Sequence, residues 1–273
     1  MTMYSEKDHT FIICAYKESP FLEECIKSIL GQTVRGHVMM TTSTPNESIY
    51  NLGRKYGICV LVNRGRTGMA EDWNFAYEKC STALLTLAHQ DDIYAKDYLE
   101  ILLDNINKSK KPLIAFTNYG ELRNGVLVNS NVLLKIKRIM LFPLKFKKIW
   151  TNIFIRRKIL SLGSPICCPS VLFVKTNLEA PVFHSGMKSN IDWEAWEKIS
   201  KYRGSFVYCS EKLMYHRIHD NSTTTEIVNE GQRRREDLEM FCKFWPKWFA
   251  LIWEKIYQLS ERSNRIKEKE KNR

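Results

Sequence analysis

Four clusters of polar residues follow short apolar runs in the N-terminal part of the chain, and their side chains could hold a charged ligand. The clusters are Tyr16–Glu18, Thr42–Thr44, Asn63–Arg66 and His89–Asp92. Ligands of an open parallel sheet bind beyond the carboxyl ends of its strands, where such clusters would meet. Arginine binds phosphate, and adjacent carboxylates bind a hard divalent cation. The pattern predicts a site for a metal-bridged nucleotide diphosphate, although Asp91 and Asp92 could instead form a surface turn that caps the next helix.

The elements that would position these clusters are alternating strands and helices. Apolar runs of strand length lie at 11–15, 37–41, 58–62, 83–88 and 113–116. Helical spacing of apolar residues predicts helices between Pro20 and Gly31, after Gly68 and after Asp92. We expect Ser19 to cap the first of these helices, with Pro20 as its first residue and Gly31 at its end. Residues 1–120 therefore predict a largely parallel sheet with helices on its faces.

The second half of the chain continues the pattern less regularly. We expect a strand at 169–175, a helix at 190–202, and two closing strands at 205–210 and 212–218. Residues 231–260 combine many aromatic side chains with lysine and arginine, which predicts an amphipathic helix, and the charged segment 261–273 predicts a frayed tail.

A basic segment in the middle of the chain carries almost all of the net charge of +12. No acidic residue occurs between Leu122 and Leu178, whereas this stretch contains eleven lysines and arginines. Residues 132–150 mix these cations with leucine, isoleucine, phenylalanine and tryptophan, as a helix on an anionic membrane surface would. A solvated helical hairpin packed on the domain would show the same pattern, so both interpretations stand.

Composition excludes several other classes of protein. The 44% hydrophobic residues and 26% charged residues are typical of a folded globular chain. The eight cysteines form no C-x-x-C pair, which speaks against a zinc ribbon or a disulfide framework and favours a reducing compartment. We expect no secretory signal and no membrane-spanning helix, so any membrane contact would be peripheral.

Three motifs in order resemble family 2 glycosyltransferases of the GT-A fold. The first is the segment 11–33, which ends in Ser28-Ile29-Leu30-Gly31-Gln32-Thr33, similar to the family's S-I-L-x-Q-T. The second is Asn63–Cys80, similar to the family's N-x-G-x-G-x-A-x-x-x-N-x-G stretch, and the third is Leu85–Glu100, similar to its L-D-x-D-D strand end. The resemblance covers residues 10–118 and continues more weakly to 225. It implies an α/β GT-A fold, with a mostly parallel sheet flanked by helices, a basic helical insertion and a C-terminal aromatic helix.

The resemblance also implies domains and donor-site residues. We expect a glycosyltransferase domain at 1–230, with a nucleotide-sugar half (10–120), the basic insertion (121–160) and an acceptor half (161–230), followed by a helix and tail at 231–273. Asp92 would coordinate Mn²⁺ or Mg²⁺ on the donor diphosphate, and Asp91 would lie near the ribose or the metal. His219, in a segment similar to the family's Y-R-x-H-x-x-S-x-T ending, would complete the metal or diphosphate site. Further donor contacts are expected at Tyr16, Thr42 and Arg66.

The chain departs from the family pattern at two places. His89 stands where the family has the first acid of its metal motif. Residues 41–46 replace the family's D-D-G-S-x-D, whose carboxylate recognises uracil. The resemblance favours a UDP-sugar, but this second departure leaves a nucleotide-sugar donor in general as the prediction.

On the acceptor side, Asp192 resembles the family acid that precedes a helix. In inverting members a carboxylate there takes the proton of the attacking acceptor hydroxyl. Glu194 is the rival base, and both acids could simply favour the start of the helix electrostatically. The neighbouring Cys167 and Cys168 are expected to serve packing.

The sequence thus predicts a metal-dependent, inverting glycosyltransferase that acts on a hydroxyl of a lipid-linked or saccharide acceptor in cell-surface polysaccharide synthesis. Its partners would be a nucleotide sugar, that acceptor and an anionic membrane surface, with no nucleic acid, and it would lie in the cytoplasm at the inner face of the cell membrane. A nucleotidyltransferase, a non-catalytic membrane- or nucleic-acid-binding protein, and an inactive transferase fold remain alternatives.

Overall fold

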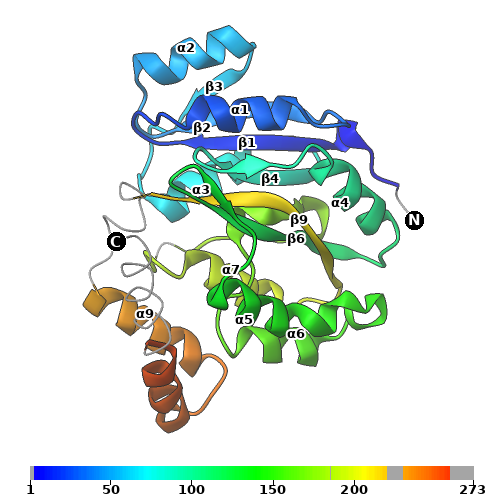
Figure 1. The fold of residues 1–273 in the computed structure, drawn as a ribbon, viewed down its shortest axis with the longest axis vertical. Coiled ribbons are helices and arrows are strands. Elements are labelled where there is room, and N and C mark those ends of the chain that lie inside the picture. Colours follow the sequence, from blue (N-terminus) through cyan, green and yellow to red (C-terminus); the bar gives the residue numbers. More distant parts are fainter. Residues whose placement is uncertain (1–2, 185, 220–229, 259–273) are drawn as a thin grey trace.

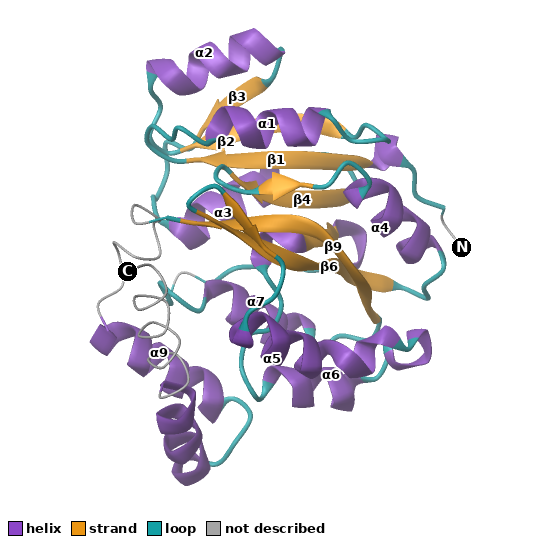
Figure 2. Cartoon of the chain, in the orientation of Figure 1, coloured by secondary structure: helices purple, strands orange, loops and turns teal. Residues whose placement is uncertain are grey.

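A mixed β-sheet flanked by helices forms the body of the molecule (Figures 1 and 2). The computed structural model describes residues 3–184, 186–219 and 230–258. Within these residues the sheet has nine strands in the order β3-β2-β1-β4-β8-β6-β9-β5, and β7 pairs with β6. The α/β fold class expected from the sequence is confirmed.

The N-terminal half is the parallel part of this sheet. Its strands are β1 (His9–Ala15), β2 (His37–Thr42), β3 (Cys59–Val62) and β4 (Leu84–His89), and all three pairings among them are parallel. The helices between and after them are α1 (Leu22–Leu30), α2 (Glu47–Tyr56), α3 (Met69–Lys79) and α4 (Tyr98–Asn107). Since parallel strands end at the same edge, the four polar clusters gather there as expected.

The expected start of the first helix is wrong. The helix α1 begins at Leu22 with Phe21 as its N-cap, and no side chain caps it. Ser19 lies before this N-cap: its hydroxyl donates to Oδ1 of Asp91 at 2.7 Å and accepts the N–H of Phe21 at 3.3 Å, so it reaches no N–H of the first helical turn. Gly31 is the C-cap, so the expected end of the helix is confirmed.

The C-terminal half makes the sheet mixed rather than mostly parallel. It contributes β5 (Ile93–Tyr94), β6 (Pro112–Arg123), β7 (Val126–Val128), β8 (Val171–Val174) and β9 (Ser205–Ile218). The strand β8 runs antiparallel to both β4 and β6, whereas β6 and β9 are parallel. The two closing strands expected at 205–210 and 212–218 are one strand, because shifts of register opposite Asn118 absorb the extra residues without ending the ladder.

The basic insertion and the C-terminal segment lie at the end of the molecule opposite α2 (Figure 1). The insertion begins with the end of β6 and the strand β7 and continues as α5 (Val132–Leu141), two short 3-10 turns and α6 (Ile153–Leu160). After α7 (Ile191–Ile199) and β9 come α9 (Glu230–Cys242) and a helical segment at 247–258. The tail expected at 261–273 lies outside the described residues.

Aromatic packing fixes α7, which carries the acceptor-side acids. Trp193 and Trp196 are fully buried; Trp196 stacks on Phe173 of β8, and Trp193 packs edge-on against Phe241 of α9. The indole of Trp193 also donates a hydrogen bond to the carbonyl of Leu160, at 3.0 Å. The first turn of α7 is therefore held firmly against the sheet and the basic insertion.

Candidate active site

Asp92, directly after β4, is buried and held by two residues of β9. One carboxylate oxygen, Oδ1, accepts the N–H of Arg217 at 2.9 Å and lies 3.0 Å from Nδ1 of His216. Burial alone would raise the pKa of Asp92, but His216, His89 and the N–H of Arg217 hold it below its ordinary value. The pKa of His216 is raised, because the attraction of Asp92 outweighs the lowering by burial. Each group thus favours the charged form of the other, and the pair joins the buried carboxylate of Asp92 to the imidazole of His216, whose side chain is 40% exposed.

The second carboxylate oxygen of Asp92 lacks a hydrogen-bond partner in the described part of the chain. Oδ2 is buried, has no hydrogen-bond partner among the described residues, and lies 4.0 Å from Nδ1 of His89. A buried carboxylate oxygen with no donor is costly unless a ligand compensates it. Oδ2 can therefore still accept a hydrogen bond or a cation.

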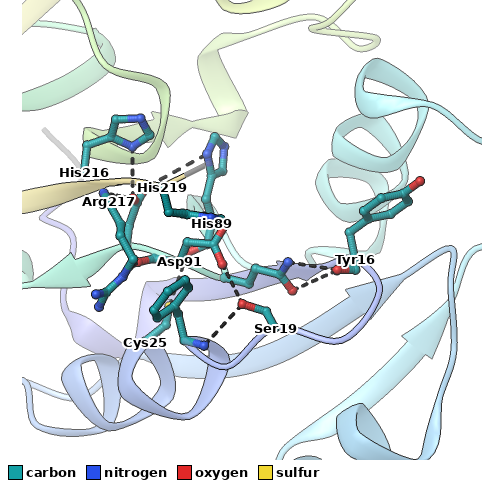
Figure 3. Close-up of polar contacts among 11 residues, drawn as sticks. Tyr16, Ser19, Cys25, His89, Asp91, His216, Arg217 and His219 are labelled. Atoms are coloured by element: carbon teal, nitrogen blue, oxygen red, sulfur yellow. Dashed lines mark hydrogen bonds and ion pairs between the residues drawn. The ribbon is translucent and has the colours of Figure 1, made fainter. Parts of the chain in front are cut away.

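Asp91, which lies among His89, His219 and Ser19 in Figure 3, is the more exposed of the two carboxylates. Its side chain is 21% exposed, against 1% for Asp92. Its Oδ2 lies 3.2 Å from Nε2 of His219, and Ser19 donates to Oδ1. The predicted residues Asp91 and His219 are therefore neighbours, whereas the partner of Asp92 is His216, which the sequence analysis missed.

Arg217 ties these groups to α1. Its guanidinium donates to the carbonyl of Asp91 at 2.8 Å, pairs with the carboxylate of Glu24, and lies 4.2 Å above the ring of Phe21. The ring of His219 packs on the same phenylalanine. The ring of Phe21 thus orients both Arg217, in β9, and His219, which follows that strand.

His89 is a packing residue in this structure. Its ring stacks on Trp73 with 5.1 Å between centroids, and burial lowers its pKa below the ordinary value. A neutral imidazole therefore stands where the family pattern has an acid. Asp91 and Asp92 are both retained beside it.

Tyr16 is joined to the end of β4 through its backbone. Gln90 accepts the N–H of Tyr16 and donates to its carbonyl, both at 2.9 Å. The half-buried ring of Tyr16 points away from Asp91 and the histidines (Figure 3). The turn after β1 is thereby fixed beside the Asp91–Asp92 turn.

The ends of β2 and β3 meet at a carboxylate that the sequence analysis also missed. Asp72 of α3 accepts the hydroxyl of Ser43 and the amide of Asn63, both at 2.7 Å. Thr42 is buried, and its hydroxyl accepts the N–H of Thr44 at 3.0 Å. Arg66 is exposed on the loop that follows. The motif 63–80 contained Asp72, but only the fold reveals that it reaches the end of β2, where the family's acid is replaced.

Asp192 lies in the first turn of α7 and has a raised pKa. Burial raises the pKa to about 6, although the N–H of Trp193 and the charge of Lys137 act in the opposite direction. Its Oδ1 accepts that N–H at 2.7 Å. No described cation lies within salt-bridge distance of Asp192, so its carboxylate has no charged partner in the described part of the chain.

Glu194, the rival base, forms a salt bridge with the C-terminal segment. Its Oε1 forms a salt bridge with Lys243, and its side chain is 14% exposed. Its other oxygen, Oε2, is buried without a hydrogen-bond partner. The geometry therefore favours Asp192 as the acid that can meet a substrate.

The carboxylates of Asp92 and Asp192 both act electrostatically on the same pair of thiols, of which Cys168 is buried and Cys167 is partly buried. Burial raises the pKa of both Cys167 and Cys168 well above the ordinary value, and the charges of Asp92 and Asp192 raise each of them further. Both carboxylates thus lie within electrostatic reach of the same pair of side chains. The thiols are protonated at neutral pH and serve packing, as expected.

The part of the chain that the structure describes contains no group of three or more histidine, cysteine or acidic side chains placed to hold a metal ion. Magnesium in phosphate-binding sites keeps several waters and uses only one or two carboxylates, with the substrate phosphates as further ligands. Asp91 and the unsatisfied oxygen of Asp92 fit that smaller requirement.

Comparisons with known proteins identify the family of the chain and its fold. The model of a family described as glycosyl transferase family 2 matches residues 10–163. The structure is similar to S. aureus TarS in complex with UDP-GlcNAc, with a TM-score of 0.63 and 13% identity over 89% of this chain and 69% of that one. It is also similar to the mannosyltransferase PcManGT from Pyrobaculum calidifontis in complex with GDP-Man and Mn²⁺, with a TM-score of 0.58 and 14% identity over 86% of this chain and 63% of that one. No protein with a curated description matches the sequence.

Proposed function

The chain belongs to glycosyl transferase family 2, and from that premise we propose that it moves a sugar from a nucleotide-diphosphate donor to an acceptor hydroxyl, with a divalent metal and with inversion at the anomeric carbon. It is a glycosyltransferase, so the nucleotidyltransferase and non-catalytic alternatives lose their support. The neighbours support a nucleotide-sugar donor, since TarS was solved with UDP-GlcNAc and PcManGT with GDP-Man and Mn²⁺. The observation that carries the proposal is the pair of carboxylates after β4 in one region with a third, unpaired carboxylate of raised pKa.

The donor diphosphate and its metal would be held at the end of β4. Asp91 and Oδ2 of Asp92 would hold Mn²⁺ or Mg²⁺, and His219 would donate to a phosphate oxygen or bind the metal directly. The metal, when bound, supplies Lewis-acid stabilisation of the leaving nucleoside diphosphate. His216 and Arg217 keep Asp92 ionised and oriented for this purpose, because an unpaired buried carboxylate would take up a proton.

The nucleoside would lie over the ends of β1, β2 and β3. The ring of Tyr16 suits stacking on the base, and Arg66 suits the phosphates. Thr42 and Asp72 lie at the strand end where a base would be read. A UDP-sugar is the first donor to test, and Asp72 offers the carboxylate that residues 41–46 lack.

Asp192 would act as the general base. Its carboxylate takes the proton from the acceptor hydroxyl while that oxygen forms a bond to the anomeric carbon. The bond from this carbon to the diphosphate oxygen breaks on the opposite face, and the nucleoside diphosphate leaves with the bonding electrons. A pKa of about 6 suits a base near neutral pH, since the group is ionised yet basic enough to hold the proton.

The acceptor would be lipid-linked or a saccharide, presented at an anionic membrane surface on the cytoplasmic side. Many large apolar side chains of the insertion and the C-terminal segment are exposed, and we name nine of them the apolar face: Ile136, Ile139, Phe142, Phe146, Phe154, Trp248, Leu251, Ile252 and Ile256. Such exposed apolar side chains beside many cations suit an interfacial segment better than a solvated one. Among the described helices, none is long and apolar enough to cross a bilayer.

The enzymatic part of the proposal is tested by release of nucleoside diphosphate in water. Purified protein is incubated with UDP-, dTDP- and GDP-sugars, with Mn²⁺ or with EDTA. We expect release from one class of donor, its loss with EDTA, and its loss in Asp192→Asn, while Glu194→Gln keeps the wild-type rate. Release that is unchanged in Asp192→Asn would overturn the role of this base, and no release from any donor would overturn the proposed donor chemistry.

A further inference from the structure

A pocket lies outside the candidate active site, between α5, the turn that follows it, and the strands β6 and β9. We name it the α5 pocket. Its volume is about 310 Å³, and its lining includes Asn118, Arg138, Ile139, Phe142, Lys145 and Tyr208. It opens where the register of β6 and β9 shifts around Asn118, so the irregular ladder leaves the space that these side chains surround.

The charge of the α5 pocket is positive, because Arg138 and Lys145 line it and neither forms a salt bridge with a described residue. Arg138 donates to Oδ1 of Asn118 at 3.2 Å and to the carbonyls of Tyr119 and Asn129 at 3.1 and 2.7 Å. These acceptors are neutral, and among the described residues no carboxylate lies within 4.0 Å of the guanidinium. Three fixed hydrogen bonds therefore hold a cation in one orientation without neutralising it.

Two further polar groups complete the lining. Lys145 is exposed, and its ammonium lies 5.7 Å from the centroid of the Phe142 ring, with no salt bridge in the described part of the chain. Tyr208 is almost fully buried, and burial raises the pKa of its phenol to about 12, so the hydroxyl stays a hydrogen-bond donor. Two cations and one hydroxyl around a small pocket are the groups that bind a phosphate.

The rim of the pocket is apolar and belongs to the apolar face. Ile139 is 72% exposed and Phe142 is 54% exposed, although both line the pocket. A free phosphate in water would gain nothing from these two side chains. A phosphate attached to acyl chains would bury them, because the chains would enter the bilayer beside the rim.

We propose that the α5 pocket binds the phosphate of an anionic phospholipid and thereby fixes the orientation of the protein on the membrane. The inference rests on the membrane association proposed above and goes beyond it, because it replaces diffuse attraction with one lipid site. Lys137, next to Arg138 in α5, contacts the hydroxyl of Tyr119 and lowers the pKa of Asp192. A lipid held by Arg138 would therefore sit on the helix that also borders the acceptor side.

The test uses monomeric dihexanoyl-phosphatidylglycerol below its micelle concentration, titrated into the full chain by calorimetry. Lys145→Gln removes a lining cation, and Lys148→Gln is the matched control, because it removes the same charge from an exposed position three residues away. We expect saturable binding that Lys145→Gln weakens by about tenfold or more, as loss of a charge-assisted hydrogen bond would. Lys148→Gln should change it by less than about twofold. Arg138→Gln, with its unfolding temperature measured in parallel, should weaken binding at least as much as Lys145→Gln.

Two further experiments distinguish a lipid site from a free-phosphate site and from diffuse membrane attraction. Glycerol 3-phosphate tests the free phosphate group, and binding as tight as that of the lipid would overturn the lipid assignment. Equal effects of Lys145→Gln and Lys148→Gln, with retained sedimentation on phosphatidylglycerol vesicles, would overturn the pocket and leave the membrane association intact. No sedimentation on either phosphatidylglycerol or phosphatidylcholine vesicles would overturn the membrane association itself, whereas the glycosyl transfer is tested separately by nucleotide release.

Discussion

Replacement of Asp192 by asparagine should stabilise the protein and abolish most of its activity. In the folded protein burial raises the pKa of this carboxyl from 3.8 to about 6, so ionisation there costs about 3 kcal/mol relative to the unfolded chain. Asparagine carries no charge and can keep the hydrogen bond from the N–H of Trp193. The gain should therefore approach that value at neutral pH, less the cost of burying the amide.

The direction of the pKa shift of Asp192 determines how the stability of the protein depends on pH. A carboxyl group with a raised pKa binds its proton more tightly in the folded state, so stability falls as the pH rises from about 4 to about 6 and is then constant. The two proteins should be equally stable near pH 4, and Asp192→Asn should be more stable above pH 6. For a chain of this size the difference corresponds to about 5 °C or more in unfolding temperature.

The assay is thermal or urea unfolding of both proteins at pH 4.5, 6 and 8, with nucleoside diphosphate release measured on the same samples. Asp104→Asn is a matched control, since its side chain is 58% exposed and its stability should change by less than about 0.5 kcal/mol. Release should fall by about 100-fold or more in Asp192→Asn and, in the wild type, should rise with pH through about 6. Equal destabilisation of Asp192→Asn at pH 4.5 and pH 8, or a wild-type rate, would refute the reasoning.

Three further substitutions probe the site and the fold. His216→Gln removes the partner of Asp92 and should cost about 1 kcal/mol at pH 6, since solvent screens a side chain that is 40% exposed. The cost should be smaller at pH 9, because the pKa of His216 is raised in the folded protein, so its charged form contributes below that pKa and is lost above it. Urea unfolding at both pH values measures this difference, and equal losses would speak against the ion pair. Glu194→Gln should keep nucleotide release within about twofold of wild type. It should lower the unfolding temperature, because it breaks the salt bridge with Lys243. A loss of release of about 100-fold would instead assign the role of general base to Glu194. Gly204→Ala should cost more than about 2 kcal/mol in urea unfolding, since φ is +150° and an added Cβ would lie 2.5 Å from the carbonyl oxygen of Lys111; a neutral result would contradict that geometry.

The parallel half of the fold could be predicted from sequence because its signals are local. Each strand from β1 to β4 is a short apolar run, and each observed bound lies within two residues of the expected one. The antiparallel entry of β8 between β4 and β6 could not be predicted, since strand direction is set by pairing across the sheet and leaves no local pattern. Ser19 was assigned to the helix for the same reason, because its actual partner Asp91 is 72 residues away.

The residues of the candidate site also divide into those that the sequence can predict and those that only the fold reveals. Asp91 and Asp92 could be found because they follow a predicted strand, and His219 because its segment resembles a motif. His216 lies in that segment too, but its contact with Asp92 spans 124 residues and depends on the pairing of β9 with β5. Asp72 reaches the end of β2 from α3, an orientation that helical periodicity alone does not give.

The most direct test of the account is donor binding with and without metal. Calorimetric titration of UDP-, dTDP- and GDP-sugars into the wild type, Asp92→Asn and the control Asp104→Asn, each with Mn²⁺ or EDTA, measures the site itself. We predict that one donor class binds the wild type and the control with Mn²⁺, and that binding is lost with EDTA and in an Asp92→Asn protein that remains folded. Binding that is equally tight in Asp92→Asn, or that does not depend on Mn²⁺, would contradict a metal-bridged donor site at Asp91 and Asp92.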